Sequence, residues 1–231
     1  MLAKGMEAIC GVTTTPRQLV LVRSKFPMVS PQVKRLPGGG SMANRTQIVC
    51  LHEGEKGRSI DPVFINRLIK SLDPIWIRPF KGSNRIRPID CGGRKSLIER
   101  MPKELKVCLN QGGNTTLMVW ADVDDDMASC EELKNRFWQQ AQSAAITQQQ
   151  FDQVVFVFAK DRLENWIQYL NTGETDENVE GPRVKHDLEV TMAAKRLARR
   201  CQFNQADPPL PPSLQWSCTN WRALSQRISS S

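Results

Sequence analysis

Short apolar runs and helix-spaced apolar positions alternate along the chain from residue 45 onward. Short runs rich in apolar residues predict buried strands at residues 46–51, 115–121 and 154–159, the last of them entirely apolar. Apolar residues spaced three or four positions apart predict helices over residues 61–72, 97–109, 131–141 and 163–170. Shorter extended pieces, in which proline favours an edge or an irregular strand, lie at residues 75–79 and 86–89. Strands that are apolar on both faces and alternate with helices predict an α/β, Rossmann-like domain with a mostly parallel central sheet flanked by helices.

The segments on either side of this alternation differ in composition. Residues 1–44 contain prolines, the Gly38–Gly40 run and no sustained apolar period, which predicts a flexible leader. An organelle transit peptide is a second interpretation of this basic leader, and Met42 is a second candidate start. The α/β domain then spans residues 45–170. Residues 171–231 hold an acidic loop, a basic helix around residues 188–201 and a closing segment at 214–228, which we expect to form a helical extension packed on the same domain.

Composition favours a folded protein that does not enter membranes. Hydrophobic residues make up 40% and charged residues 24% of the 231 positions, close to the averages for globular proteins. No apolar run approaches the roughly 20 residues that cross a bilayer, so we expect a cytoplasmic protein without a membrane partner. The seven cysteines include no C-x-x-C pair, and only two histidines are present. Any bound metal should therefore be held by oxygen ligands.

The net charge of +8 is unevenly distributed. Residues 1–41 supply +5 of it, from six Lys and Arg against one Glu. Two later clusters hold nine Lys and Arg against three acids, at 78–106, and six against two, at 183–200. Because phosphate binding depends on where cations gather, both clusters are candidate nucleic-acid surfaces, with DNA favoured over RNA. Their candidate contact residues are Arg94, Lys95, Arg196 and Arg199. A solvated basic face opposite an apolar helix stripe is the alternative for the second cluster.

Carboxylates follow the predicted strands at the points where those strands end. Glu53 follows the first strand, Asp122 and Asp124 follow the strand at 115–121, and Glu164 stands five residues beyond 154–159. Ligands of open α/β sheets bind at the carboxyl ends of the strands, so these acids should converge. They would repel one another without a compensating cation, and Mg²⁺ or Mn²⁺ prefers oxygen ligands. The predicted metal ligands are Glu53, Asp122, Asp124, Asp126 and Glu164.

A divalent metal at this edge of the sheet would support phosphoryl transfer, because it polarises a phosphate oxygen and lowers the pKa of a bound water. Glu53 would serve as general acid or base if its acidic neighbours raised its pKa. A calcium-binding EF-hand is excluded, because Met127 stands where that loop needs glycine and Leu133 where it needs glutamate.

Short motifs in a fixed order resemble those of one known superfamily. Cys50-Leu51-His52-Glu53-Gly54 is followed some seventy residues later by the segment Val119-Trp120-Ala121-Asp122-Val123-Asp124-Asp125-Asp126. This order is similar to the TOPRIM superfamily, whose motifs are a Glu, often Glu-Gly, after the first strand and Asp-x-Asp after the third. Residues 160–166 (KDRLENW) and 91–96 (CGGRKS) more narrowly resemble small stand-alone TOPRIM-like proteins related to the overcoming-lysogenisation-defect nucleases. The resemblance covers residues 46–228.

The resemblance implies a Mg²⁺- or Mn²⁺-dependent nuclease acting on nucleic-acid phosphodiesters, in bacterial defence against phage and together with an ATPase partner protein. Glu53, Asp122 and Asp124 match its catalytic motif residues, and Glu164 matches a later Glu that helps hold a second metal. A downstream catalytic lysine is matched by Lys195, with Lys185 as the rival. Relatives often carry an Asp where this chain has Gly57, and Asp61 is a substitute through a longer loop. A topoisomerase nucleophile is not expected, because Tyr169 in a helix is the only tyrosine.

Simpler structural explanations exist for several of these residues. The acids at 122–126 would solvate a loop ahead of a helix that Ser129 and Glu132 begin as a capping box. Asp161 and Glu164 have the spacing of a second capping box. The turn at 93–96 lacks the glycine spacing of a nucleoside-triphosphate loop, although its backbone and Lys95 suit a DNA phosphate. Trp216 and Trp221 are expected to complete a core rather than to stack on a base.

Two other functions stay open for the same residues. The first is a nucleic-acid or protein-binding module with the same fold and no catalysis. The second is a nucleotide-sugar transferase, in which Asp122-Val123-Asp124 would be the metal-binding Asp-x-Asp motif. The folded chain ahead of Asp122 is short for the nucleotide-binding domain that such transferases need.

Overall fold

The computed structural model of the chain describes residues 45–54, 59–79, 84–112, 114–124, 126–184, 186–203 and 209–229. The chain divides into two units, Met1–Gly39 and Gly40–Ser231, and every described residue belongs to the second. The predicted leader at 1–44, Gly57 and Lys185 lie outside the described residues.

Four parallel strands form the central sheet. They are β1 (Gln47–His52), β2 (Arg87–Asp90), β3 (Thr115–Val123) and β4 (Val155–Lys160), in the order β2-β1-β3-β4. The sequence predicted a parallel sheet from strands that are apolar on both faces, and the buried residues of β1, β3 and β4 confirm that reasoning. β2 is an edge strand that contains Pro88, as its composition indicated.

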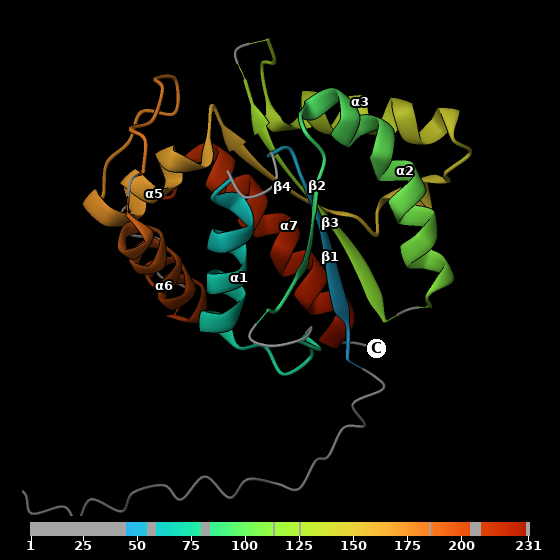
Figure 1. Cartoon of the computed structure of the whole chain (residues 1–231), viewed down its shortest axis with the longest axis horizontal. Helices are drawn as coiled ribbons and strands as arrows, with labels where there is room; N and C mark the ends of the chain where they lie inside the picture. Colours follow the sequence, from blue (N-terminus) through green and yellow to red (C-terminus); the bar gives the residue numbers. More distant parts are fainter. Residues whose placement is uncertain are drawn as a thin grey trace, which may run out of the picture. The chain divides into compact units, whose positions relative to one another are not determined.

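Helices cover both faces of this sheet (Figure 1). One layer contains α1 (Asp61–Leu72), α5 (Leu163–Thr172), α6 (Asp187–Phe203) and α7 (Pro212–Ser229). The other contains α2 (Arg94–Asn110), α3 (Cys130–Ser143) and the short α4 (Gln148–Phe151). The described part of the chain is thus an α/β sandwich of three layers, as the alternation of elements predicted.

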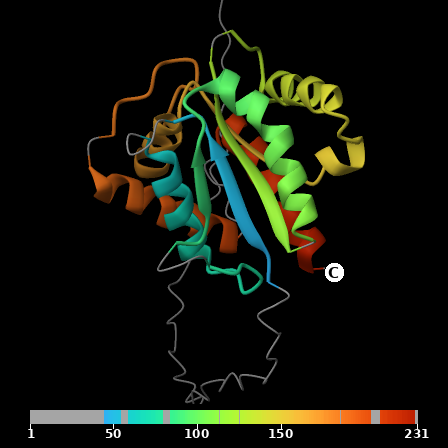
Figure 2. The ribbon, with the colours of Figure 1, turned by 45° about the vertical axis from the view of Figure 1, so that its right-hand side comes forward.

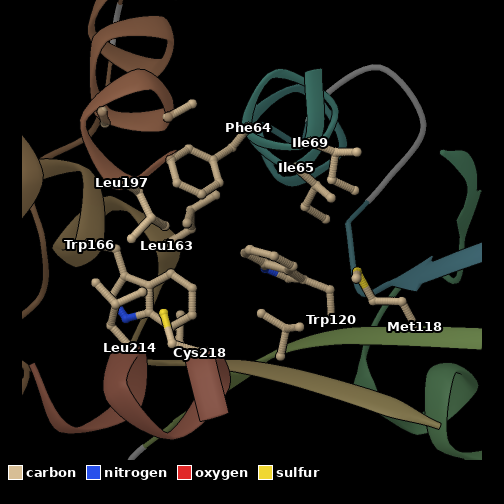
Figure 3. Close-up of a cluster of buried hydrophobic side chains, with 14 of the residues drawn as sticks. Phe64, Ile65, Ile69, Met118, Trp120, Leu163, Trp166, Leu197, Leu214 and Cys218 are labelled. Carbon is tan, nitrogen blue, oxygen red and sulfur yellow. The ribbon is translucent and has the colours of Figure 1, made fainter. Parts of the chain in front are cut away.

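Alternate residues of β3 bury their side chains in opposite layers. Met118 and Trp120 face the layer of α1, and their neighbours Leu117 and Val119 face that of α2. Trp120 lies between Phe64 of α1 and Trp166 of α5, with ring centroids 6.2 and 5.6 Å away (Figure 3). This edge-to-face packing fixes β3 against α1 and α5, whose first turns carry acidic residues.

α7 covers the outer edge of β4. The Ser217 hydroxyl accepts a hydrogen bond from the Phe158 amide (2.9 Å) and donates one to the Phe158 carbonyl (3.0 Å). Asn220 Nδ2 donates to the Phe156 carbonyl (2.9 Å). Trp216 stacks on Phe158 with ring centroids 5.2 Å apart, so it completes a core as expected. These side chains replace a neighbouring strand and close this edge to further strand pairing.

The structure differs from the sequence prediction at several places, and α2 begins at Arg94, three residues before the predicted helix. Residues 75–79 were expected to be a short strand, but they form a turn with a single bridge between Thr46 and Ile77. α4 was not predicted, because four residues are too few to show a helical period. β3 extends two residues beyond the predicted end, so Asp122 lies inside the strand. Among the described residues, no helix is long and apolar enough to cross a membrane.

We expect Ser217→Ala to lower the free energy of unfolding by about 1–3 kcal/mol, because it leaves the buried Phe158 amide without its partner. Urea denaturation followed by circular dichroism measures the change. Thr219→Ala is the matched control, since the exposed Thr219 hydroxyl only bonds Gln215 on the same helix. It should stay within about 0.5 kcal/mol of the wild type. Equal losses in the two variants would contradict a special role for the edge contact.

Candidate functional site

The candidate site lies at the carboxyl end of the sheet, between β1 and β3. α1 leads from β1 to β2 over one face, whereas α3 and α4 lead from β3 to β4 over the other. The chain therefore leaves these neighbouring strands in opposite directions, which is where open α/β sheets bind ligands (Figure 2). His52 pairs with Trp120 at the end of β1, so Glu53 lies one residue and Asp122 two residues beyond this pair on adjacent strands.

Close packing fixes the turn that carries Glu53. The Glu53 carbonyl accepts a hydrogen bond from the Gly93 amide (2.7 Å), which ties the end of β1 to the start of α2. A Cβ atom on Gly54 would lie 2.1 Å from the Cβ atom of Ser59, so a larger residue would force the loop apart. The Glu-Gly pair that the sequence singled out therefore has a steric reason in this chain.

His52 is buried beneath this turn. Its Nε2 atom lies 3.0 Å from Asp90 Oδ1 at the end of β2. Burial lowers the pKa of His52, and the negative charge of Asp90 opposes that change. The ring is therefore a largely neutral packing element between the two strand ends.

Arg94 begins α2 directly beside the acids. The glycine pair at 92–93 has φ angles of 69° and 120°, which side chains rarely allow, and it turns the chain from β2 into α2. The guanidinium of Arg94 pairs with Glu53 (Nε to Oε1, 3.4 Å), with Asp126 (Nη1 to Oδ1, 2.9 Å) and with Asp124. Burial opposes the charge of Arg94, but the three carboxylates hold its pKa above the usual value. Arg94 is thus the counter-charge of the site.

Asp122 is the most constrained of the acids. Its Oδ1 atom is buried and has no hydrogen-bond partner among the residues that the structure describes. Burial raises the pKa of this carboxyl well above its usual value, and the charges of Asp61, Glu53, Glu164 and Asp124 raise it further. A buried carboxylate oxygen without a partner is unfavourable, so Asp122 needs a proton or a cation.

The pKa values of two neighbouring acids are also raised. Burial raises the pKa of Glu53 to about 7, while the charge of Arg94 opposes the change. Burial raises the pKa of Asp61 to about 6, against a hydrogen bond from Ser59 and with a further rise from Glu164. Both carboxyls therefore exchange protons near neutral pH.

Asp61 joins the predicted acids although it was not among the predicted ligands. It lies in the first turn of α1, where acids are ordinary on helical grounds alone. The sequence offered it only as a substitute for an acid at Gly57. Its place as the first described acid after Glu53 was the available signal, and the packing of α1 against β3 decides its position.

Glu164 does not belong to a capping box, which was the simpler explanation offered for it. The helix α5 is preceded by Arg162 at its N-cap position, without a side-chain cap. The Asp161 carboxylate instead accepts a hydrogen bond from the Gly181 amide (3.3 Å). Glu164 is left in the first turn of α5, where its charge acts on Asp122 and Asp61.

Asp126 lies on the outer side of the site. Its carboxylate pairs with Arg94 and with Arg136 of α3 (3.2 Å), and the hydrogen bond from Arg94 lowers its pKa. The next helix begins as predicted, since the Ser129 hydroxyl accepts a hydrogen bond from the Glu132 amide. The Glu132 carboxylate, however, bonds the Ala128 amide rather than closing a box on Ser129.

No group of three or more His, Cys, Asp or Glu side chains is arranged to hold a metal ion in the described parts of the chain. Arg94 gives a physical reason, because its guanidinium already lies among Glu53, Asp124 and Asp126. Asp122 and Asp61 receive no described ion pair. The site therefore combines the Arg94 guanidinium with a buried carboxyl, that of Asp122, with which the guanidinium forms no ion pair.

The basic candidates lie in different surroundings. Lys95 is exposed at the start of α2, next to Arg94, and Arg199 is exposed on α6. Arg196 donates to the carbonyls of Leu170 and Asn171 (3.0 and 2.9 Å), so it caps the end of α5. Lys195 is exposed on α6, next to Arg196. Of the predicted basic residues, only Arg94 contacts the acids among the described residues.

Comparison with known proteins identified no relative of this chain. No family model, no curated protein and no solved structure matches the chain.

We expect the metal-free protein to lose thermal stability as the pH rises from about 5 to about 8. The raised pKa values of Glu53 and Asp61 mean that the folded protein holds protons that the unfolded chain releases. Their stabilising contribution is complete below the unfolded pKa values and is lost as the pH rises through about 6 to 7. Melting curves in a chelating buffer measure this loss. Asp122→Asn should reduce it, because one negative charge is removed; an unchanged profile would assign the dependence to other groups.

Proposed function

We propose that the acids between β1 and β3 bind Mg²⁺ or Mn²⁺ and that the protein is a TOPRIM-type nuclease acting on DNA phosphodiesters. The observation that carries the proposal is the buried, unpartnered oxygen of Asp122 together with the neighbouring acids that raise its pKa. Such an arrangement is costly unless a proton or a cation compensates it. Hard divalent cations prefer carboxylate oxygens, so the chemistry of these residues fits that cation.

Glu53, Asp122 and Asp124 are the proposed ligands nearest the strand ends. Asp61 and Glu164 approach Asp122 from the first turns of α1 and α5, and they would extend the site toward a second cation. A bound cation would polarise the scissile phosphate and stabilise the leaving oxygen. The order of the residues supports the assignment, since Glu53 follows the first strand and Asp122 and Asp124 stand at the end of the third.

Glu53 is suited to move a proton during this reaction. A general acid or base works best when its pKa lies near the working pH, and the pKa of Glu53 is raised to about 7. Its carboxylate lies beside Asp122, so it could accept a proton from an attacking water. In the proposed reaction the same carboxyl returns that proton to the solvent or to the leaving oxygen.

Arg94 has a double role in this proposal. Without a divalent cation it neutralises Glu53, Asp124 and Asp126. With the divalent cation bound, the acids no longer require the charge of Arg94. Its guanidinium can then form a bidentate pair with a substrate phosphate. Lys95, exposed in the next position of α2, would contact the neighbouring phosphate. The resemblance extends the proposal to a defence role beside an ATPase partner.

We expect purified protein to nick plasmid DNA with Mg²⁺ or Mn²⁺, and Asp122→Ala to lower the rate by roughly 100-fold or more, because even outer-shell changes at metal sites cost 10–100-fold. Calorimetric titration should show Mn²⁺ binding to the wild type and none to Asp122→Ala. Asp152→Ala is the matched control, since Asp152 is exposed ahead of β4, at the opposite end of the sheet. DNA cleavage in the absence of a divalent metal, or full activity of Asp122→Ala, would contradict the proposal.

A binding module without catalysis is the second candidate, and the ion pairs of Arg94 favour it. In that case Arg94 closes the acidic site permanently, in keeping with the lack of a metal-holding group among the described residues. The fold would then present its basic residues to a nucleic acid or a protein without reacting with it.

Arg94→Ala separates the two candidates. If the acids bind metal, removing the competing guanidinium should tighten Mn²⁺ binding several-fold, while DNA cleavage falls. If Arg94 only closes the site, the variant should melt at a lower temperature than the wild type and neither protein should bind Mn²⁺. Arg100→Ala is the control on the same helix, because Arg100 is exposed and pairs with Glu104. Calorimetry and melting curves give both readouts.

A further inference from the structure

Two cysteines outside the acidic site lie close to each other. Cys201 lies near the end of α6 and Cys218 in α7, and the two thiols are close enough to shift each other's pKa values in opposite directions. Both line a pocket of about 220 Å³ together with Trp76, Trp221 and Arg222. Figure 3 shows the sulfur of Cys218 directed away from α7 into the apolar layer. Cys201 is half-buried, so the pocket gives a small molecule a route to this pair.

The pair is electrostatically asymmetric. The hydrogen bond from Cys218 lowers the pKa of Cys201 to about 7, burial opposes this change, and the positive charge of Arg222 adds to the lowering. The same hydrogen bond, together with burial, raises the pKa of Cys218. Cys201 is therefore the thiolate, which is the reactive form of cysteine, and Cys218 is its proton donor.

The other described cysteines lack this activation. Burial raises the pKa of Cys91 and, to about 12, that of Cys130, although both are half-buried like Cys201. Cys50 and Cys108 are buried, and burial raises their pKa values too. By exposure alone, Cys91, Cys130 and Cys201 would be equally reactive. The interactions with Cys218 and Arg222 lower the pKa of Cys201 only.

We propose that Cys201 and Cys218 form a redox-active dithiol, a modification site for small disulfides of the glutathione class. The Cys201 thiolate attacks one sulfur of the small disulfide, which releases one small thiolate and leaves a mixed disulfide on Cys201. Cys218 then attacks the Cys201 sulfur, its proton passes to solvent, and the second small thiolate leaves. The protein dithiol is oxidised to one disulfide and the small disulfide is reduced to two thiols.

The disulfide would join helices that pack on different elements. α6 packs on α1 and α5, which carry Asp61 and Glu164, whereas α7 covers the edge of β4. Closing the loop between 201 and 218 restricts the unfolded chain, so oxidation should raise the melting temperature by roughly 5 °C or more. The inference does not depend on metal binding or nuclease activity.

The experiment treats the full chain with oxidised glutathione, blocks free thiols under denaturing conditions and digests with trypsin. Cleavage after Arg200 and Arg222 places both cysteines in one peptide, residues 201–222. We expect this peptide to lose two hydrogen atoms and to escape blocking, and the reaction at Cys201 to be roughly tenfold faster than at Cys91 or Cys130. Loss of the disulfide upon reduction completes the cycle.

Two variants test the order of the steps. Cys218→Ser should stop the reaction at a stable mixed disulfide on Cys201, and Cys201→Ser should leave Cys218 unmodified. Cys130→Ser is the matched control and should form the disulfide at the wild-type rate. Equal modification of Cys91, Cys130 and Cys201 in the wild-type protein would overturn the proposal, as would a peptide 201–222 that never loses its two hydrogens. The peptide analysis of the wild-type protein tests the proposal even if one of the variants fails to fold.

Discussion

The parallel pairing of β1 with β3 is the constraint on which the candidate site depends. It sets His52 opposite Trp120. Glu53, one residue further, and Asp122, two residues further, therefore share one edge of the sheet. Trp120 fixes β3 against α1 and α5, and both helices point an acidic first turn at the same edge. Apolar packing thus holds several carboxylates close together although their charges repel one another. The site therefore requires a positive charge or a proton to compensate them.

The chain solves this problem in two ways. Arg94 supplies a positive charge to the outer acids, because the glycine turn ahead of α2 starts that helix beside Glu53. The inner acids, Asp122 and Asp61, are instead left with raised pKa values. The Arg94 guanidinium thus pairs with the outer acids, while the buried Asp122 carboxyl has no positive partner among the described residues. A divalent cation that displaced the guanidinium would compensate both groups of acids. For this reason we favour metal binding over a permanently closed site.

The C-terminal helices stabilise the sheet and carry chemistry of their own. Ser217 and Asn220 of α7 satisfy the edge of β4, which would otherwise be open to pairing with another chain. Cys218, the residue after Ser217, lies close to Cys201 of α6. The dithiol reaction uses none of the acids of the candidate site, so each proposal can fail without the other.

Local spacing in the sequence was sufficient for most of the elements and for the edge of the sheet at which the acids gather. α1 has the predicted bounds, and Glu53 and Asp122 were found because strand ends are visible as apolar runs that stop at a charge. The roles of Arg94, Asp61 and Cys201 were not visible, because each depends on a partner brought close by the fold. Arg94 is 41 positions from Glu53 and was predicted to face nucleic acid, since sequence shows its charge but not its neighbours. The sequence determined which groups carry chemistry, and the tertiary structure decided which of them compensate one another, because electrostatic and thiol interactions depend on distance in space rather than along the chain.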